Sequence, residues 1–379
     1  MVSQLIGSTP PKHTRAVTLA LRDVVKRNGL TPGEWVVACS GGPDSLALTF
    51  AVADLGGRMG AEVRAVIVDH GLRNESAEEA ERTRLLLEKW KIAARVVPVS
   101  VGSEGGIEAA AREARYGALR ENSGAGAVVF LGHTMDDQAE SVLLGLGRGS
   151  GARSLSGMRE VVREDAPSSR TWVRPLLGVR RWDTEGMCAE LGLEPVQDPS
   201  NRLQGGWARA DGGPLPRVAV RHRVIPSLGE ALGRDVVPLL ARSAQLLDAD
   251  ASALEEWAGR CWSPGEALIV EDLAGLPPAV RSRVLKDAAE RAGASQLAQA
   301  HVSALDRLVV GYEGGAPIDL PGGVKAWRER EPEPKREPEP KREPECELRE
   351  QQYEPRANGR GEGTRDRTVR RLIKIMKTS

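Results

Sequence analysis

The sequence is poor in cysteine and has no excess of charge of either sign. Its 379 residues include four cysteines, which are scattered and form no Cys-x-x-Cys pair, so neither a disulfide framework nor zinc or cluster spacing is predicted. Lysine plus arginine and aspartate plus glutamate both number 53. A surface for nucleic acid would therefore have to be a local patch, because the chain as a whole has no basic field.

Long apolar runs are also missing. No run reaches the length of about 20 residues that crosses a bilayer. Residues 1–11 lack the basic-then-apolar pattern of a signal peptide. We therefore expect a soluble cytoplasmic protein with no membrane partner. A chain of 379 residues is too long for one small core, so at least two domains are expected.

The most informative stretch is the glycine-rich segment Ser40-Gly41-Gly42-Pro43-Asp44-Ser45. The apolar run 34–39 before it predicts a buried strand, and the apolar run 46–52 after it predicts the buried face of a helix. A glycine turn between a strand and a helix start presents free backbone N–H groups and the positive end of the helix dipole, which together bind anions. The two serines add hydroxyl donors, and the two glycines allow a ligand close to the backbone.

This segment differs from two common nucleotide-binding loops. No lysine follows the glycines as in a Walker A loop, and no Gly-x-Gly-x-x-Gly is present. The segment resembles instead the pyrophosphate loop (PP-loop), Ser-Gly-Gly-x-Asp-Ser, of ATP pyrophosphatases, which cleave ATP to AMP and pyrophosphate. All six positions match in a strand–loop–helix context. An incidental glycine-rich turn is therefore the weaker interpretation.

Strands and helices alternate through the N-terminal half. Further strands are predicted over 62–68, 94–101 and 127–131. Helices are predicted over 13–28, 76–90 and 107–121, and from near residue 135. The alternation predicts an α/β fold with a doubly wound, mostly parallel sheet. Polar clusters follow the strands at 40–45, 69–73 and 132–140, and the carboxyl ends of parallel strands meet at one edge, where ligands bind.

The pattern changes after residue 152. Helical spacing over 230–260 and 277–309 predicts a second, smaller, mainly helical domain. Glu-Pro-Lys-Arg repeats begin at residue 331 and predict disorder, because alternating charge with proline prevents a packed core. We therefore divide the chain into a catalytic domain with the PP-loop, a smaller helical substrate-binding domain and a disordered tail. Their expected bounds are 1–225, 226–327 and 328–379.

Two helices carry further candidate site residues. Arg112 and Arg115 lie on one broad face of the helix 107–121, for which a solvated face is the simpler interpretation. In the next helix, Asp137 and Glu140 share a face at i and i+3 spacing, shortly after His133. Acidic residues here also stabilise the start of the helix, a role that does not exclude catalysis.

Taken in order, these motifs resemble the tRNA(Ile)-lysidine synthase family. The matching segments after the PP-loop are 68–73, 108–116, 132–140, 148–151, 174–177, 198–201 and 217–222. The PP-loop marks only the superfamily, whereas His-x3-Asp-Gln-x-Glu together with Asp-Pro-Ser-Asn narrows the match. The likeness covers residues 15–240 well and extends loosely to about residue 325. The tail departs from the family, which usually continues as a folded segment.

The resemblance implies modification of the wobble cytidine of an isoleucine tRNA with a CAU anticodon. ATP would adenylate the oxygen on C2 and release pyrophosphate. L-lysine would then attack C2 and displace AMP, leaving lysidine. The implied cofactors are ATP and Mg²⁺, and the implied partners are tRNA(Ile) and L-lysine. A homodimer is compatible with the sequence.

The resemblance also implies roles for residues in the PP-loop unit. The loop 40–45 would hold pyrophosphate, with Asp44 as a Mg²⁺ ligand. Arg112 and Arg115 would stabilise developing negative charge. Asp137 and Glu140 would hold the lysine amine and accept its proton, with His133 as an alternative base.

Three residues are the implied tRNA contacts: Asn201, Arg217 and Arg221. A glycine- and proline-rich excursion, residues 202–216, separates Asn201 from the two arginines. The assignment of the RNA-facing arginines is therefore open at this point.

Other classes of protein remain alternatives. A tRNA 2-thiolation enzyme on the same loop usually needs paired cysteines, and GMP synthetase needs a glutaminase with a nucleophilic cysteine; neither is recognisable here. A non-catalytic RNA-binding protein is a third alternative. The joint presence of Asp44, His133, Asp137 and Glu140 favours an enzyme over that alternative. RNA binding without pyrophosphate release would favour the binding protein.

Overall fold

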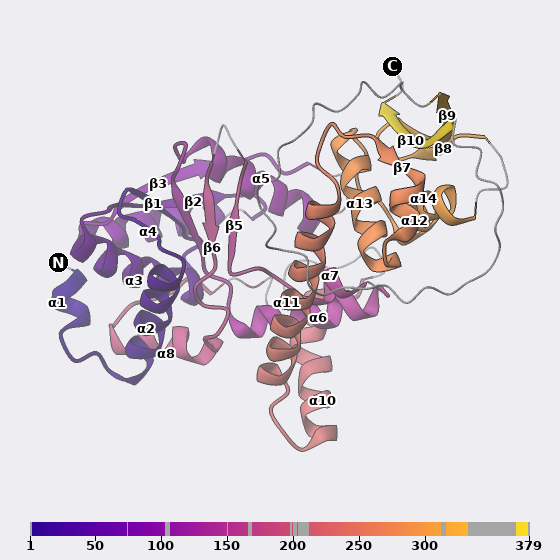
Figure 1. Ribbon diagram of the computed structural model, residues 1–379. Helices are drawn as coiled ribbons and strands as arrows, with labels where there is room; N and C mark the ends of the chain where they lie inside the picture. The colour runs from indigo at the N-terminus through magenta and orange to yellow at the C-terminus, as the bar shows by residue number, and fades with distance from the viewer. Residues whose placement is uncertain are drawn as a thin grey trace, which may run out of the picture. The chain divides into compact units, whose positions relative to one another are not determined.

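The computed structural model describes residues 2–377 apart from 74, 103–106, 150, 166–168, 198, 200–202, 204–211, 312–315 and 333–368. The chain divides into two compact units, Met1–Ala251 and Ser252–Ser379 (Figure 1). The expected domain boundary after residue 225 falls inside the first unit. Residues 225–237 belong with that unit because they line one cavity together with residues of its helix α6 (Met135–Gly147).

The first unit is built on a six-stranded sheet with the strand order β3-β2-β1-β4-β6-β5. The strands are β1 (Glu34–Ala38), β2 (Glu62–Asp69), β3 (Ala93–Pro98), β4 (Val128–Leu131), β5 (Val161–Arg163) and β6 (Thr171–Val173). All neighbours pair in parallel except β5 and β6, which are antiparallel. The predicted doubly wound, mostly parallel sheet is confirmed. Its order reverses between β1 and β4, the place where such sheets bind ligands.

Helices cover both faces of this sheet. Those of the first unit are α1 (Val2–Ile6), α2 (Lys12–Arg27), α3 (Pro43–Met59), α4 (Ser76–Lys89), α5 (Ile107–Glu121), α6 (Met135–Gly147), α7 (Ala152–Leu155), α8 (Arg181–Glu190), α9 (Pro216–Ala219), the π-helix η2 (Val220–Val224) and α10 (Ile225–Leu232). Helix α11 (Val237–Cys261) runs from the first unit into the second.

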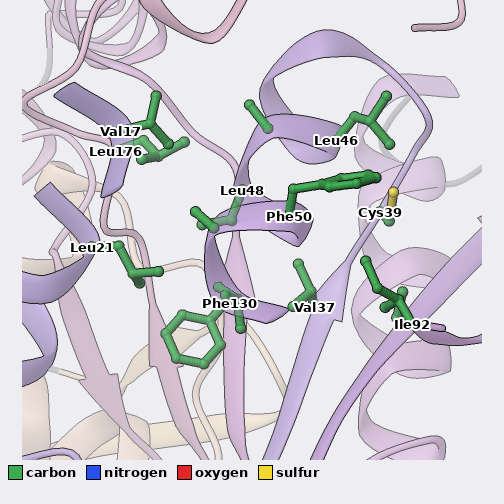
Figure 2. Close-up of a cluster of buried hydrophobic side chains, with 14 of the residues drawn as sticks. Val17, Leu21, Val37, Cys39, Leu46, Leu48, Phe50, Ile92, Phe130 and Leu176 are labelled. Carbon is green, nitrogen blue, oxygen red and sulfur yellow. The ribbon is translucent and has the colours of Figure 1, made fainter. Parts of the chain in front are cut away.

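Strand β1 shows why its sequence is apolar throughout. Trp35 and Val37 are fully buried on the face covered by α2, α3, α4 and α8, whereas Val36 is fully buried on the other face, with Leu119 of α5. Successive side chains of a strand point to opposite faces, so a strand covered on both sides is apolar at every position. Figure 2 shows the first face, where Phe50 of α3 lies among Val37 and other buried side chains.

The PP-loop connects β1 to α3 and is held by its own serines. The backbone N–H of Ser40 donates to Ser45 Oγ at 3.0 Å, and Ser45 Oγ lies 3.1 Å from the carbonyl of Gly42, to which it donates. Gly41 has φ +81°, and a Cβ there would lie 2.5 Å from the Thr83 hydroxyl oxygen. Pro43 opens α3 at its first turn, where a missing N–H is harmless.

The described part of the second unit contains the end of α11, three further helices and a small antiparallel sheet in the order β7-β10-β9-β8. Its elements are β7 (Leu268–Ile269), α12 (Val270–Gly275), α13 (Pro278–Arg291), α14 (Gln299–Val310), β8 (Ile318–Leu320), β9 (Val324–Pro332) and β10 (Val369–Lys377). The second, smaller domain is confirmed, and it carries a sheet that the helical spacing did not predict. Among the described residues, no helix has both the length and the apolar character of a membrane span.

Strand β10 lies within the segment expected to be a disordered tail. It pairs with β9 from Val369 opposite Pro332 to Lys377 opposite Val324. Leu372 and Ile373 are buried, and Ile373 joins the core of the second unit. Basic residues alternate with these apolar ones, so composition alone hid the strand. The Glu-Pro-Lys-Arg repeats from residue 333 onward lie outside the described residues.

Gly132 provides a test of how tightly β4 packs against the PP-loop. A Cβ at this position would lie 3.0 Å from Ser45 Cα and 3.1 Å from Ser45 N, which are backbone atoms that cannot rotate away. We expect Gly132→Ala to lower the free energy of unfolding by about 1–3 kcal/mol, as overpacking does. Urea unfolding monitored by circular dichroism would measure it.

Gly57→Ala is the matched control, because no atom lies within 4 Å of a Cβ added there on the exposed side of α3. In a helix interior this change should stabilise by about 0.5–1 kcal/mol. Equal stability of the two variants would contradict the close packing of Gly132.

Candidate active site

The predicted polar clusters meet at the carboxyl edge of the sheet. The PP-loop follows β1, His70 follows β2, His133 follows β4 and Arg174 follows β6. Two of these segments are joined directly, since Arg181 contacts Asp44 at the start of the PP-loop helix α3 and Asp137 of the helix α6.

The start of α6 uses Asp137 in two ways. Its Oδ2 accepts hydrogen bonds from the Thr134 backbone N–H at 2.8 Å and from the Thr134 hydroxyl at 3.0 Å, forming a capping box. Its Oδ1 is left for Arg181 Nη2 at 2.8 Å. One carboxylate oxygen therefore fixes the helix, while the other faces the site.

Arg181, at the first position of α8, joins three carboxylates. Its Nε lies 3.4 Å from Asp44 Oδ2, its Nη2 2.8 Å from Asp137 Oδ1, and its Nη1 3.5 Å from Glu140 Oε1. Thr184, one turn further along α8, donates its hydroxyl to Asp44 Oδ1. Sequence reasoning missed Arg181. The only signal was its place four residues after the matched segment 174–177.

Glu140 is the most deeply buried carboxylate of the site, with a side chain 1% exposed. Arg221 of η2 binds it twice, through Nε to Oε1 at 2.7 Å and through Nη2 to Oε2 at 3.1 Å. Arg217 Nε lies 3.9 Å from Glu140 Oε2. The two arginines expected to contact tRNA thus lie against Glu140 in this structure. Asn201, the third expected contact, lies outside the described residues.

Burial and charge set the protonation of these acids. Burial raises the pKa of Asp44 to about 6; Arg181 lowers it and Asp137 raises it, so the Arg181 ion pair only partly offsets the burial. Burial also opposes ionisation of Asp137, but Arg181 and other partners outweigh it and hold its pKa below the usual value. Arg181 stays charged, because four neighbouring carboxylates raise its pKa against the effect of burial.

Arg112 and Arg115 of α5 form a separate group with Tyr116. Arg112 is exposed, and its Nη2 donates to the Tyr116 hydroxyl at 3.2 Å; Arg115 is half-buried. Burial lowers the pKa of His133, and Arg115 lowers it further against the pull of Asp137, so this imidazole is neutral. The structure brings Asp44, Asp137 and Glu140 together, and it keeps Arg112 and Arg115 out of their ion pairs.

A cavity of about 210 Å³ opens beside Glu140. It is lined by three acids, three arginines and an apolar wall: Asp136, Glu140, Asp235, Arg180, Arg181, Arg221, Ile225, Pro226, Gly229, Val236 and Val237. The mixture suits a ligand that has both an aliphatic stem and charged groups of both signs.

The fit to Mg²⁺ can be tested on the donors present. Among the residues that the structure describes, no three His, Cys, Asp or Glu side chains gather closely enough for a self-contained metal site. Mg²⁺ carried by a nucleotide needs only one or two carboxylates besides phosphate and water oxygens. Asp44 meets that need, because it lies in the first turn of α3 beside the PP-loop.

The fold and this edge define a class: an α/β enzyme that uses ATP through a PP-loop. The family model described as the PP-loop domain matches residues 14–228, and the model of the TilS substrate-binding domain matches residues 268–331.

Relatives narrow the class to one family. The chain is 42% identical over 331 residues to the tRNA(Ile)-lysidine synthase of Thermobifida fusca, covering 85% of this chain and 97% of that one. It is 43% identical over 317 residues to that of Salinispora tropica, covering 78% and 89%. It is 44% identical over 296 residues to that of Mycolicibacterium paratuberculosis, covering 76% and 85%. The chain belongs to the tRNA(Ile)-lysidine synthase family.

The raised pKa of Asp44 predicts a pH-dependent effect on stability. In the folded protein this carboxyl titrates at about 6 instead of its ordinary 3.8, so its ionised form destabilises the folded state above pH 6. Asp44→Asn should therefore raise the free energy of unfolding at pH 8 by up to about 3 kcal/mol, and the gain should shrink as the pH falls from 6 towards 4. Urea unfolding at several pH values with a chelator present measures this.

Asp23→Asn, on the exposed side of α2, is the control and should change stability by less than about 0.5 kcal/mol. A loss of stability in Asp44→Asn at pH 8 would mean that the ion pair with Arg181 outweighs the burial of Asp44.

Proposed function

We propose that this protein converts the wobble cytidine of tRNA(Ile) with a CAU anticodon to lysidine, using ATP and L-lysine. One observation carries the proposal: Arg181 joins the PP-loop carboxylate Asp44 to Asp137 and Glu140. The phosphate-binding loop and a pair of acids suited to an amine are therefore bridged by a single side chain, that of Arg181. Membership of the family supports the same reaction.

In the first step the C2 oxygen of the cytidine attacks the α-phosphorus of ATP, and pyrophosphate leaves. The free N–H groups at the start of α3 and the hydroxyl groups of Ser40 and Ser45 hold the departing phosphates. Asp44 would hold the Mg²⁺ that accompanies the nucleotide, and that cation would offset phosphate charge. A neighbouring positive charge would in turn lower the pKa of Asp44 from about 6 and so favour its ionised form.

In the second step the lysine amine attacks C2, the bond from C2 to the adenylated oxygen breaks, and AMP leaves. Glu140 holds the amine. Arg221 now occupies both of its oxygens and marks where a cation binds. The aliphatic stem of lysine fits the apolar wall of the cavity at Ile225 and Val237.

We assign the amine proton to Glu140 rather than to its neighbours. His133 is a weak base, because burial and nearby arginines lower its pKa. Asp137 is also weak, because Arg181 holds its pKa low and the capping of α6 occupies one of its oxygens. Glu140 lines the cavity in which we place lysine, and both of its oxygens bind an arginine rather than the start of the helix. We also propose a cytoplasmic location, for which a tRNA substrate is the support.

The reaction is tested by incubating the protein with ATP, labelled lysine and a tRNA(Ile) transcript with a CAU anticodon. A methionine tRNA with the same anticodon is the control. We expect label in the first RNA only. Pyrophosphate release without incorporated lysine would point to another acceptor on the same loop, and no pyrophosphate release would overturn the assignment as an ATP-dependent ligase.

Glu140→Gln separates the two steps. It removes the charge that binds the amine and keeps the shape, so the KM for lysine should rise about 10- to 100-fold, the effect of losing one charge-assisted hydrogen bond. Pyrophosphate release that depends on tRNA should change much less. Steady-state kinetics with labelled lysine and a pyrophosphate assay measure both.

Glu88→Gln makes the same change on an exposed site of α4 and should leave both rates unaltered. A parallel fall in pyrophosphate release and lysine incorporation in Glu140→Gln, with normal thermal unfolding, would contradict the assignment of Glu140 to the amine.

A further inference from the structure

A second group of charges at the carboxyl edge consists of arginines without acids. Arg112 and Arg115 come from α5, and Arg174 directly follows β6. Within the described part of the chain, none of the three forms an ion pair with a carboxylate. We propose that Arg174, with Arg112, Arg115 and the Tyr116 hydroxyl, forms a phosphate-binding site. The inference rests on the proposed function, which brings phosphates of both ATP and RNA to this edge.

Tyr116 holds the group together. Its hydroxyl lies 3.2 Å from Arg174 Nη2 and 3.2 Å from Arg112 Nη2. The guanidinium carbons of Arg112 and Arg115 lie 4.9 and 5.8 Å from the centre of its ring. The ring itself packs against Trp172 of β6 at 5.0 Å between centroids. Three cations are thus gathered around one neutral side chain, which fixes their positions without neutralising them.

Arg174 is the most buried of the three cations, at 7% exposed. Its Nη1 donates to the carbonyl of Arg159 at 2.9 Å, so both terminal nitrogens have neutral partners. Its Nε is buried and has no hydrogen-bond partner, and the same is true of Arg115 Nε. Two donors on neighbouring guanidinium groups are therefore unused in a place that water reaches poorly.

A comparison within the chain shows how unusual this is. Arg281 is equally buried, at 5% exposed, and it binds Asp306 through Nε at 2.7 Å. Arg181 has three carboxylate partners. A buried cation without an anion destabilises the fold, because no Coulomb attraction offsets the free energy lost when the cation leaves water. Arg115 shows the effect, since burial and then Arg112 lower its pKa. An external anion would remove this penalty.

Phosphate is the anion that this geometry favours. Guanidinium groups bind phosphate oxygens by paired hydrogen bonds, and several of them around one group match its tetrahedral charge. His133 Nδ1 and His70 Nδ1, after β4 and β2, are also buried without a partner, which adds neutral hydrogen-bonding groups at the same edge. The carboxylates of this edge lie instead with Arg181 and Arg221. The lysine amine and the phosphate would therefore bind to different groups of side chains.

The test compares Arg174→Gln and Arg174→Lys with the wild-type chain. Two probes identify the source of the phosphate: ATP, and an RNA hairpin with the anticodon stem and loop of the isoleucine tRNA. If the phosphate belongs to the nucleotide, Arg174→Gln should weaken ATP binding at least tenfold and leave RNA binding unchanged. If it belongs to the RNA, RNA binding should weaken and the slope of log affinity against log salt should fall by about one.

Arg174→Lys should recover part of the lost affinity, because it restores the charge but not the paired donors. Arg58→Gln removes one positive charge from the far end of α3 and should change neither affinity. If Arg174→Gln does not fold, the variants Arg174→Lys and Tyr116→Phe provide the test. Each should lower the affinity for the same one of the two probes several-fold. Wild-type affinity for both probes in every folded variant of Arg174 and Tyr116 would overturn the proposal.

The outcome is distinguishable from failure of the proposed function. Lysine transfer by the wild-type protein tests that function independently of any Arg174 variant. If transfer is absent while one probe depends on Arg174, the phosphate site stands and the reaction is different.

Discussion

The site depends on one guanidinium group placed among three buried carboxylates. Asp44 comes from the helix after β1, and Asp137 and Glu140 come from the helix after β4, so the switch in strand order brings like charges together. Arg181 makes this arrangement possible by contacting all three. Its attraction does not fully cancel the cost of burial, since the pKa of Asp44 remains raised. Of the three acids, Asp44 is therefore the one whose ionised form is incompletely stabilised by its arginine partner.

Several residues contribute to both the fold and the site. Asp137 caps α6 with one oxygen and binds Arg181 with the other. Gly132 lets the end of β4 come within contact distance of the PP-loop backbone. Such double use makes the site rigid, because an acid that is also a helix cap cannot turn away from its partner. It also explains why helix capping and catalysis are compatible interpretations of the same acidic residues.

The charged side chains at the carboxyl edge of the sheet form two separate groups. Glu140 gathers Arg221 and Arg181, whereas Arg112, Arg115 and Arg174 gather around the neutral Tyr116. The acids of the edge therefore lie in one group together with arginines, and the arginines that have no acid partner lie in the other. The neutral state of His133, which burial and the arginines favour, fits its place beside both groups.

Sequence alone determined the local features. Alternating apolar segments gave the sheet, the six residues of the PP-loop gave the anion site, and i and i+3 spacing put Asp137 and Glu140 on one face. These are properties of neighbouring residues, so they are visible in the order of the chain. The pairing of β10 with β9 was hidden, because the two strands are separated by a long low-complexity segment.

The partners of the charged groups were decided only by the tertiary structure. Arg181 lies 137 residues from Asp44, and Arg221 lies 81 residues from Glu140. On a sequence such arginines resemble any solvated helix face. Packing of α8 and η2 against the carboxyl edge removes them from water and selects which acids they meet. Burial also decides the pKa of Asp44 and leaves Arg174 without a carboxylate, and burial is a property of the whole fold.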